Sequence, residues 1–241
     1  MQILPDWLKN GYLRLMEPIA AWLVRRRVHP NTITIVGTIF MVAGGVLYGT
    51  GHIRTGGLLL GITALTDVLD GMVARRSNTT SVFGAFLDSS LDRVADGAVL
   101  GGLAVFYALN DVYYSVTMVV ICLAGLVGAF MTSYTRARAE ALGLDAKVGM
   151  LQRPERVVLL SAPQAFFGVA LNGWVLSAII IILTITAWIT VVQRMKYVYD
   201  KTRTPGPVSD AAPASESIEY RFWERRPSRR DTSARPALKG E

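Results

Sequence analysis

Two short stretches decide how the rest of the chain is interpreted: Asp67-Val-Leu-Asp-Gly-Met-Val-Ala-Arg75 and Gly84-Ala-Phe-Leu-Asp-Ser-Ser-Leu-Asp92. The first holds Asp67 and Asp70, three residues apart, and the second holds Asp88 and Asp92, four residues apart. Residues at these spacings share one face of a helix. Both stretches lie within long apolar runs, where a charged side chain is costly and is a functional candidate by default. The pattern therefore predicts two membrane helices that each present a pair of carboxylates.

The composition indicates a membrane protein and excludes several kinds of site. Of 241 residues, 51% are hydrophobic and 18% are charged, whereas a soluble domain carries about 25% charge. One Cys and two His exclude a disulfide framework, a multi-Cys zinc site and a His-rich metal site. The net charge of +7 fits basic loops on the cytoplasmic face of a membrane better than it fits a nucleic-acid partner.

Six apolar stretches of roughly the length that a membrane span needs follow residue 30, at 31–49, 56–75, 82–108, 113–137, 155–171 and 173–197. Lys and Arg gather before the first, between the second and third, between the fourth and fifth, and after the sixth. The other three connections contain one basic residue, Arg54. This alternation follows the positive-inside rule. We therefore expect an all-α integral membrane protein of the plasma membrane, with six spans and both termini in the cytoplasm.

The two ends of the chain differ from this central part, residues 29–200. Residues 1–28 have apolar side chains at helical spacing and end in the basic triplet Arg25, Arg26 and Arg27, which is typical of a helix lying in the membrane interface. Packing of that helix on its own protein is the alternative, and the two are compatible. Residues 201–241 are rich in Pro, Ser, Ala and charged residues, which predicts a disordered cytoplasmic tail.

The four carboxylates are expected to meet. The short polar connection at 76–81 makes the two helices antiparallel neighbours, so the carboxylates fall at a similar depth near the cytoplasmic surface. Four such groups repel one another unless cations neutralise them. Ligands that are all oxygen select hard cations such as Mg²⁺, Mn²⁺ or Ca²⁺, and two such ions form a clamp for phosphate chemistry. The alternative is a set of caps and salt bridges that use Arg75, Arg76 and Arg93.

The complete pattern resembles the signature of the CDP-alcohol phosphotransferase (phosphatidyltransferase) family, and the likeness covers roughly residues 28–200. Eight residues at fixed spacing carry it: Asp67, Asp70, Gly71, Ala74, Arg75, Gly84, Asp88 and Asp92. The resemblance implies an enzyme that transfers a substituted phosphate from a CDP-linked donor to an alcohol and releases CMP. It implies that the four aspartates hold two divalent cations, Mg²⁺ or Mn²⁺, and that Asp92 is also the general base.

The resemblance also implies which residues bind the donor, CDP-diacylglycerol. Gly71, Arg75 and Ser81 would contact its CDP moiety. Residues 30–34 resemble the family segment that closes over the nucleotide. This segment adds four candidates, Asn31, Thr32, Ile33 and Thr34. A plain helix start, capped by Asn31 or Thr32, is the alternative for this segment.

Basic stretches at 133–140, 153–156 and 193–194 all fall on the expected cytoplasmic side. The candidates for an acceptor site are Ser133, Arg136, Arg153, Arg156 and Arg194. Several Arg in one pocket suit a phosphorylated acceptor, because guanidinium binds phosphate bidentately. The alternative is flanking charge with a salt bridge to Glu140 or Glu155. These stretches resemble those of bacterial phosphatidylinositol phosphate synthases and related archaeal enzymes, which implies inositol phosphate as the acceptor.

Two other functions stay open at this point. Glycerol 3-phosphate is a second acceptor that Arg would suit. A divalent-cation transporter could also use intramembrane carboxylates, although it would favour the bilayer midplane and inverted repeats, and no repeat is visible. The resemblance further implies a homodimer. Gly44, Gly45, Gly101 and Gly102 would line either a helix interface between copies or packing within one chain.

Overall fold

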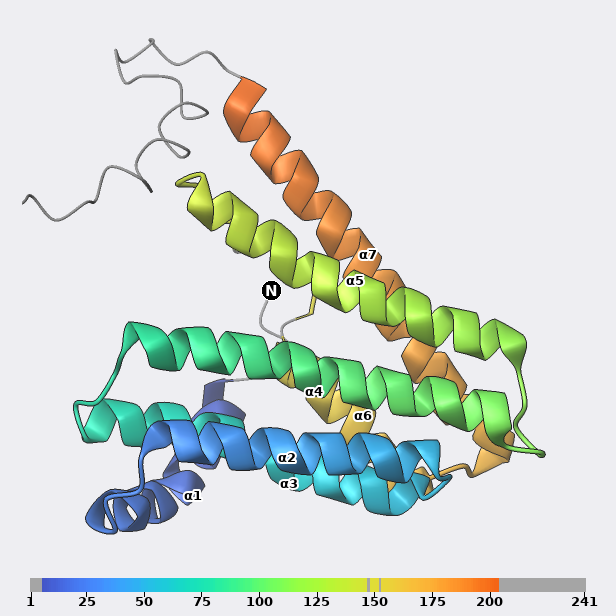
Figure 1. Ribbon diagram of the computed structural model, residues 1–241, viewed down its shortest axis with the longest axis horizontal. Helices are drawn as coiled ribbons and strands as arrows, with labels where there is room; N and C mark the ends of the chain where they lie inside the picture. The colour runs from blue at the N-terminus through green and yellow to red at the C-terminus, as the bar shows by residue number, and fades with distance from the viewer. Residues whose placement is uncertain (1–5, 147, 152, 204–241) are drawn as a thin grey trace, which may run out of the picture. The chain divides into compact units, whose positions relative to one another are not determined.

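The structure is a computed structural model that describes residues 6–146, 148–151 and 153–203 (Figure 1). The first five residues of the expected interfacial helix and the expected tail beyond Arg203 lie outside these ranges. The described residues form helices and their connections, without a strand. The helices are α1 Asp6–Arg25, α2 Pro30–Gly49, α3 Ile53–Arg76, α4 Val82–Leu109, α5 Val116–Ala141, α6 Arg153–Phe167, the 3₁₀ turn η1 Leu171–Gly173, and α7 Trp174–Arg203.

The all-α expectation is confirmed, and each predicted apolar stretch coincides with one helix. Within the part of the chain that the structure describes, four helical segments are long and apolar enough to cross a membrane: 30–49, 53–76, 116–141 and 171–203. Helix α4 is long but carries four charged residues between residues 88 and 96, Asp88, Asp92, Arg93 and Asp96. Helix α6 has 15 residues and ends before the expected residue 171, because Gly168 takes a positive φ of 57°, a conformation that glycine adopts without strain.

Polar side chains mark where the helices begin. Ser81 caps α4 by accepting a hydrogen bond from the backbone N–H of Gly84 at 2.9 Å, as hydroxyls do at helix starts. Helix α2 differs from the expectation, because its cap is neither Asn31 nor Thr32. The ring Nδ1 of His29 accepts from the backbone N–H of Asn31 at 3.2 Å, and Pro30 opens the helix. The side chains of Asn31 and Thr32 are thereby left for other contacts.

Small residues bring α2 and α4 into close contact. A Cβ atom on Gly45 would collide with the backbone of Ala98, and one on Gly102 would collide with the backbone of Gly45. Gly44 approaches Leu60 of α3 in the same way, whereas a Cβ on Gly101 would meet nothing within 4 Å. Three of the four glycines noted in the sequence therefore serve packing within one chain, as small residues do between membrane helices.

Helix α2 packs on α3 and α4, α3 also contacts α6, and α4 contacts α5 (Figure 1). Helices α5 and α7 are joined by polar side chains. Thr184 donates to the carbonyl of Ile121 at 3.3 Å, and the indole N–H of Trp188 donates to the carbonyl of Ala124 at 3.1 Å. The carboxylate-bearing helices α3 and α4 thus both pack against α2, which fixes them relative to each other.

Helix α1 packs on its own protein along one face. Its apolar residues join a buried cluster with α2 and α3: Met16, Ala20, Ile33, Leu69 and Val73. Glu17 forms an ion pair with Arg76 at the end of α3. On its other side Ile19 and Trp22 are exposed, and the guanidinium of Arg26 lies 5.5 Å from the ring centre of Trp22. This second face remains available to a membrane interface.

Candidate active site

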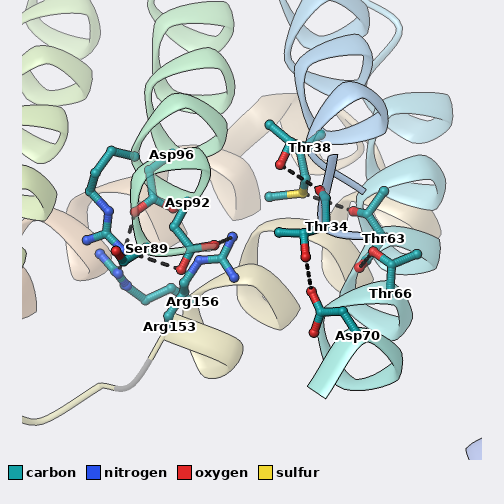
Figure 2. Close-up of polar contacts among 12 residues, drawn as sticks. Thr34, Thr38, Thr63, Thr66, Asp70, Ser89, Asp92, Asp96, Arg153 and Arg156 are labelled. Carbon is teal, nitrogen blue, oxygen red and sulfur yellow. Dashed lines mark hydrogen bonds and ion pairs between the residues drawn. The ribbon is translucent and has the colours of Figure 1, made fainter. Parts of the chain in front are cut away.

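A threonine on α2 holds one of the predicted metal-binding carboxylates. The hydroxyl of Thr34 donates to Oδ2 of Asp70 at 2.8 Å, and Figure 2 shows the two side chains pointing toward each other. Thr34 lies in the first turns of α2 and also contacts the carbonyl of Pro30 at 3.3 Å. One turn later, Thr38 donates to the carbonyl of Thr34 at 2.9 Å. The packing of α2 on α3 thus orients Asp70, while the side chain of Asp67 lies outside what the structure describes.

A second group of charged residues lies between α4 and α6. Nη2 of Arg153 lies 2.7 Å from Oδ1 of Asp92, and Nη2 of Arg156 lies 3.6 Å from Oδ2 of Asp96. Figure 2 shows the two aspartates on α4 facing the two arginines of α6. The four side chains are 12–18% exposed. We call this group the α4–α6 ladder, because its members are one turn apart on each helix.

A third arginine approaches the first pair of the ladder. Nη2 of Arg93 lies 3.5 Å from Oδ2 of Asp92. Removing charges from water is costly, and pairing offsets that cost only if both partners stay in place. The predicted general base Asp92 is therefore held in a basic environment at the start of α6. Asp88, one turn earlier on α4, is exposed instead.

The structure describes the side chains of three of the four predicted metal ligands, Asp70, Asp88 and Asp92. Among the residues that the structure describes, no three His, Cys, Asp or Glu side chains come close enough to hold one metal ion. Asp70 contacts Thr34, and Asp92 contacts Arg153. The candidate metal ligands are nevertheless carboxylate oxygens, which are the ligands that hard divalent cations require. The residues thus fit such a cation by their chemistry, and the fourth carboxylate, Asp67, belongs to the same helix face as Asp70.

The donor-site candidates fall into two places. Gly84 lies where the starts of α2 and α4 come close together. A Cβ atom at this position would lie 3.1 Å from the Ser81 hydroxyl and 3.2 Å from Oδ1 of Asn31. Gly71 lies under the guanidinium of Arg75, where a Cβ would approach Nη1 to 3.3 Å.

Two further donor-site candidates adjoin these on α2. Thr32 is exposed. Ile33 is buried in the α1–α2–α3 cluster, so only its backbone is in a position to contact a ligand.

The four arginines among the acceptor-site candidates lie within electrostatic range of one another as a chain from Arg136 through Arg194 and Arg156 to Arg153, but their hydrogen bonds and ion pairs differ. Arg153 and Arg156 lie in the ladder. Arg136 forms an exposed ion pair with Glu140 at 2.8 Å, which is the alternative noted from the sequence. Arg194 donates to the carbonyls of Val148, at 2.8 Å, and Thr132, and Ser133 donates within its own helix to Ala129 at 3.2 Å.

Sequence reasoning missed Asp96. Its signal was present, because Asp96 follows Asp92 at the same four-residue spacing that joins Asp88 to Asp92. Asp96 and Arg156 also line a mostly apolar pocket, together with side chains such as Leu60, Val99 and Leu183. A charged pair at an apolar cavity is costly, and it is therefore a candidate for function.

Comparison with known proteins decides the family. The family model described as CDP-alcohol phosphatidyltransferase matches residues 27–199. The chain belongs to this family. It is therefore an enzyme of phospholipid biosynthesis, and the transporter hypothesis is left without support. The matched range contains the whole aspartate motif and the α4–α6 ladder.

Two named members of the family are similar to this chain over most of its length. The chain is 38% identical over 227 residues to the phosphatidylinositol phosphate synthase of Streptomyces avermitilis, covering 89% of this chain and 88% of that protein. It is 35% identical to the archaetidylinositol phosphate synthase of Methanothermobacter thermautotrophicus, covering 79% of this chain and 91% of that protein.

Two solved structures of one family member have a similar fold. The Mycobacterium tuberculosis phosphatidylinositol phosphate synthase with CDP-DAG bound matches with a TM-score of 0.70 and 36% identity, covering 77% of this chain and 94% of that one. The same enzyme in complex with manganese and citrate matches with a TM-score of 0.69 and 36% identity, covering 76% of this chain and 88% of that one. This member of the family thus shares its fold with an enzyme of known structure over about three quarters of its own length.

Proposed function

We propose that the chain is a phosphatidylinositol phosphate synthase, which transfers the phosphatidyl group from CDP-diacylglycerol to inositol phosphate and releases CMP. The observation that carries the proposal is the contact of 2.7 Å between Arg153 and Asp92. It places a guanidinium, the group best suited to bind a phosphate, beside the predicted general base. The names of the relatives from Streptomyces and Mycobacterium support the same reaction.

The proposed chemistry uses few residues of the chain. Asp92 accepts the proton of the acceptor hydroxyl, whose oxygen then bonds to the phosphorus that carries diacylglycerol. The bond from that phosphorus to the CMP oxygen breaks, and CMP leaves with the electron pair. The acceptor phosphate is bound by Ser133, Arg136, Arg153, Arg156 and Arg194. These residues hold the hydroxyl close to the donor, which supplies the proximity effect.

We assign two divalent cations, Mg²⁺ with Mn²⁺ as a substitute, to Asp67, Asp70, Asp88 and Asp92. Such ions neutralise the donor diphosphate and the charge on departing CMP. The solved relative with manganese supports this assignment, as does a donor set made of carboxylate oxygens. Asn31, Thr32, Ile33, Thr34, Gly71, Arg75 and Ser81 are assigned to the CDP-diacylglycerol site.

In our proposal the membrane arrangement is six spans, α2 to α7, with α1 in the interface. The apolar second half of α4, residues 97–109, supports a span there, and the alternation of basic loops supports both termini and the active site on the cytoplasmic side of the plasma membrane. Residues 1–28, 29–200 and 201–241 are then the interfacial helix, the catalytic membrane domain and a cytoplasmic tail. A homodimer is part of the same proposal.

A panel of acceptors tests the function. Purified protein with Mg²⁺ and CDP-diacylglycerol is incubated with inositol phosphate, inositol, glycerol 3-phosphate or serine, and CMP release is followed. We expect CMP with inositol phosphate alone. Turnover only with glycerol 3-phosphate would replace the acceptor assignment, and no CMP with any acceptor would contradict the donor assignment.

A further inference from the structure

Asp96 lies outside the family motif, yet it is the second carboxylate of the α4–α6 ladder. Its side chain is 12% exposed, and the side chain of Arg156, its partner, is 14% exposed. A carboxylate buried to this degree is costly unless it is paired. No step of the proposed reaction uses Asp96, so its presence requires another explanation.

The contact between Asp96 and Arg156 differs from the other contact of the ladder, which joins Asp92 to Arg153. The distance of 3.6 Å is suitable for an ion pair and too long for a hydrogen bond. Consistent with this, Oδ2 of Asp96 and Nε of Arg156 are buried atoms without a hydrogen-bond partner among the described residues. Asp96 therefore attracts the guanidinium by charge and leaves its Nε–H donor uncommitted.

An uncommitted donor on a held arginine is what a phosphate site needs. Arg194, which is assigned to the same phosphate, uses its Nε and Nη1 for the carbonyls of Val148 and Thr132. Arg156 lines the pocket that it shares with Asp96 and also a second, small pocket beside Thr132 and Thr190. Of these two pockets, only the first contains a carboxylate.

We propose that Asp96 is a positioning residue, which holds Arg156 beside Asp92 and Arg153 with donors ready for the acceptor phosphate. The inference rests on the proposed function, because the phosphate in question is that of inositol phosphate. Asp96 itself contacts no substrate in this proposal. All of its effect on acceptor binding is expected to pass through Arg156.

Steady-state kinetics of Asp96→Asn test this. The substitution keeps the shape of the side chain and removes its charge, so the KM for inositol phosphate should rise about tenfold. The kcat should change less than about threefold, and the KM for CDP-diacylglycerol should not change, since neither the base nor the donor site is altered. Asp111→Asn is the matched control, because Asp111 is an exposed carboxylate on the loop after α4.

A double-mutant cycle separates positioning from a general structural role. In an Arg156→Gln background, Asp96→Asn should cause no further rise in the KM for inositol phosphate. Independent, multiplicative effects of the two substitutions would overturn the proposal, as would a loss of kcat with an unchanged KM. Should Asp96→Asn not fold, Asp96→Glu replaces it in the same cycle, with a smaller rise expected in the single variant. Failure of the proposed function is distinguishable, because the wild-type protein itself would then show no turnover with inositol phosphate.

Discussion

The two sides of the candidate site hold their carboxylates by different means. On the α2–α3 side, the hydroxyl of Thr34 donates to Asp70 at 2.8 Å. On the α4–α6 side, guanidinium groups face Asp92 and Asp96. A hydroxyl orients a carboxylate without cancelling its charge, whereas a guanidinium opposes that charge directly. In our proposal the α2–α3 side therefore serves cations alone, whereas on the α4–α6 side Asp92 serves both the cations and the acceptor, beside arginines that bind an anion.

The largest effect is expected from Asp92→Asn. An amide cannot accept the proton of the acceptor hydroxyl, so CMP release should fall by about 10³-fold. The thermal unfolding temperature in detergent should also fall, because Arg153 and Arg93 lose the charge that they face, so turnover is compared well below the unfolding temperature of the variant. A variant that retains more than a tenth of wild-type turnover would show that Asp92 is not the base, and that the two sides do not divide their roles as described.

Arg153→Gln is expected to have the next largest effect. The change removes the charged partner of Asp92 and the donors assigned to the acceptor phosphate, so kcat/KM for inositol phosphate should fall about a hundredfold. Arg138→Gln is the matched control, since that arginine is exposed near the end of α5 and is assigned to no site. Equal losses of kcat/KM in both variants would show that the α4–α6 ladder has no particular role in acceptor binding.

Thr34→Val should affect the cation rather than the acceptor. It removes the hydroxyl that orients Asp70 and keeps the volume of the side chain, so the Mg²⁺ concentration for half-maximal CMP release should rise about tenfold. Thr38→Val is the control, because its hydroxyl contacts the backbone of Thr34 and not a carboxylate. A change in the KM for inositol phosphate at saturating Mg²⁺ would show that the two sides are not separate.

Gly102→Ala tests how the two sides are held together. A methyl group there would collide with the backbone of Gly45, and such overpacking destabilises a protein by about 1–3 kcal/mol. Gly101→Ala, one residue away, meets nothing within 4 Å and should leave stability nearly unchanged. Equal unfolding curves for the two variants in detergent would contradict the close approach of α2 to α4.

Much of the fold could be predicted from local signals. Apolar runs indicated helices α2 to α7, because each run is longer than a strand requires and is bounded by polar or glycine-containing connections. The cap of α2 could not be predicted in the same way. His29 is an unusual capping residue, and its role depends on the orientation of its ring toward Asn31. The early end of α6 depends similarly on the backbone conformation of Gly168.

The sequence by itself determined the family and the residues of the motif, because Asp67, Asp70, Asp88 and Asp92 are joined by spacings that a helix converts directly into a shared face. Only the tertiary structure decided which arginine faces which aspartate. That pairing depends on how α6 packs relative to α4, helices separated in the chain by the whole of α5. Spacing along one helix cannot specify such a contact, so Asp96 and its relation to Arg156 became visible only in the folded chain.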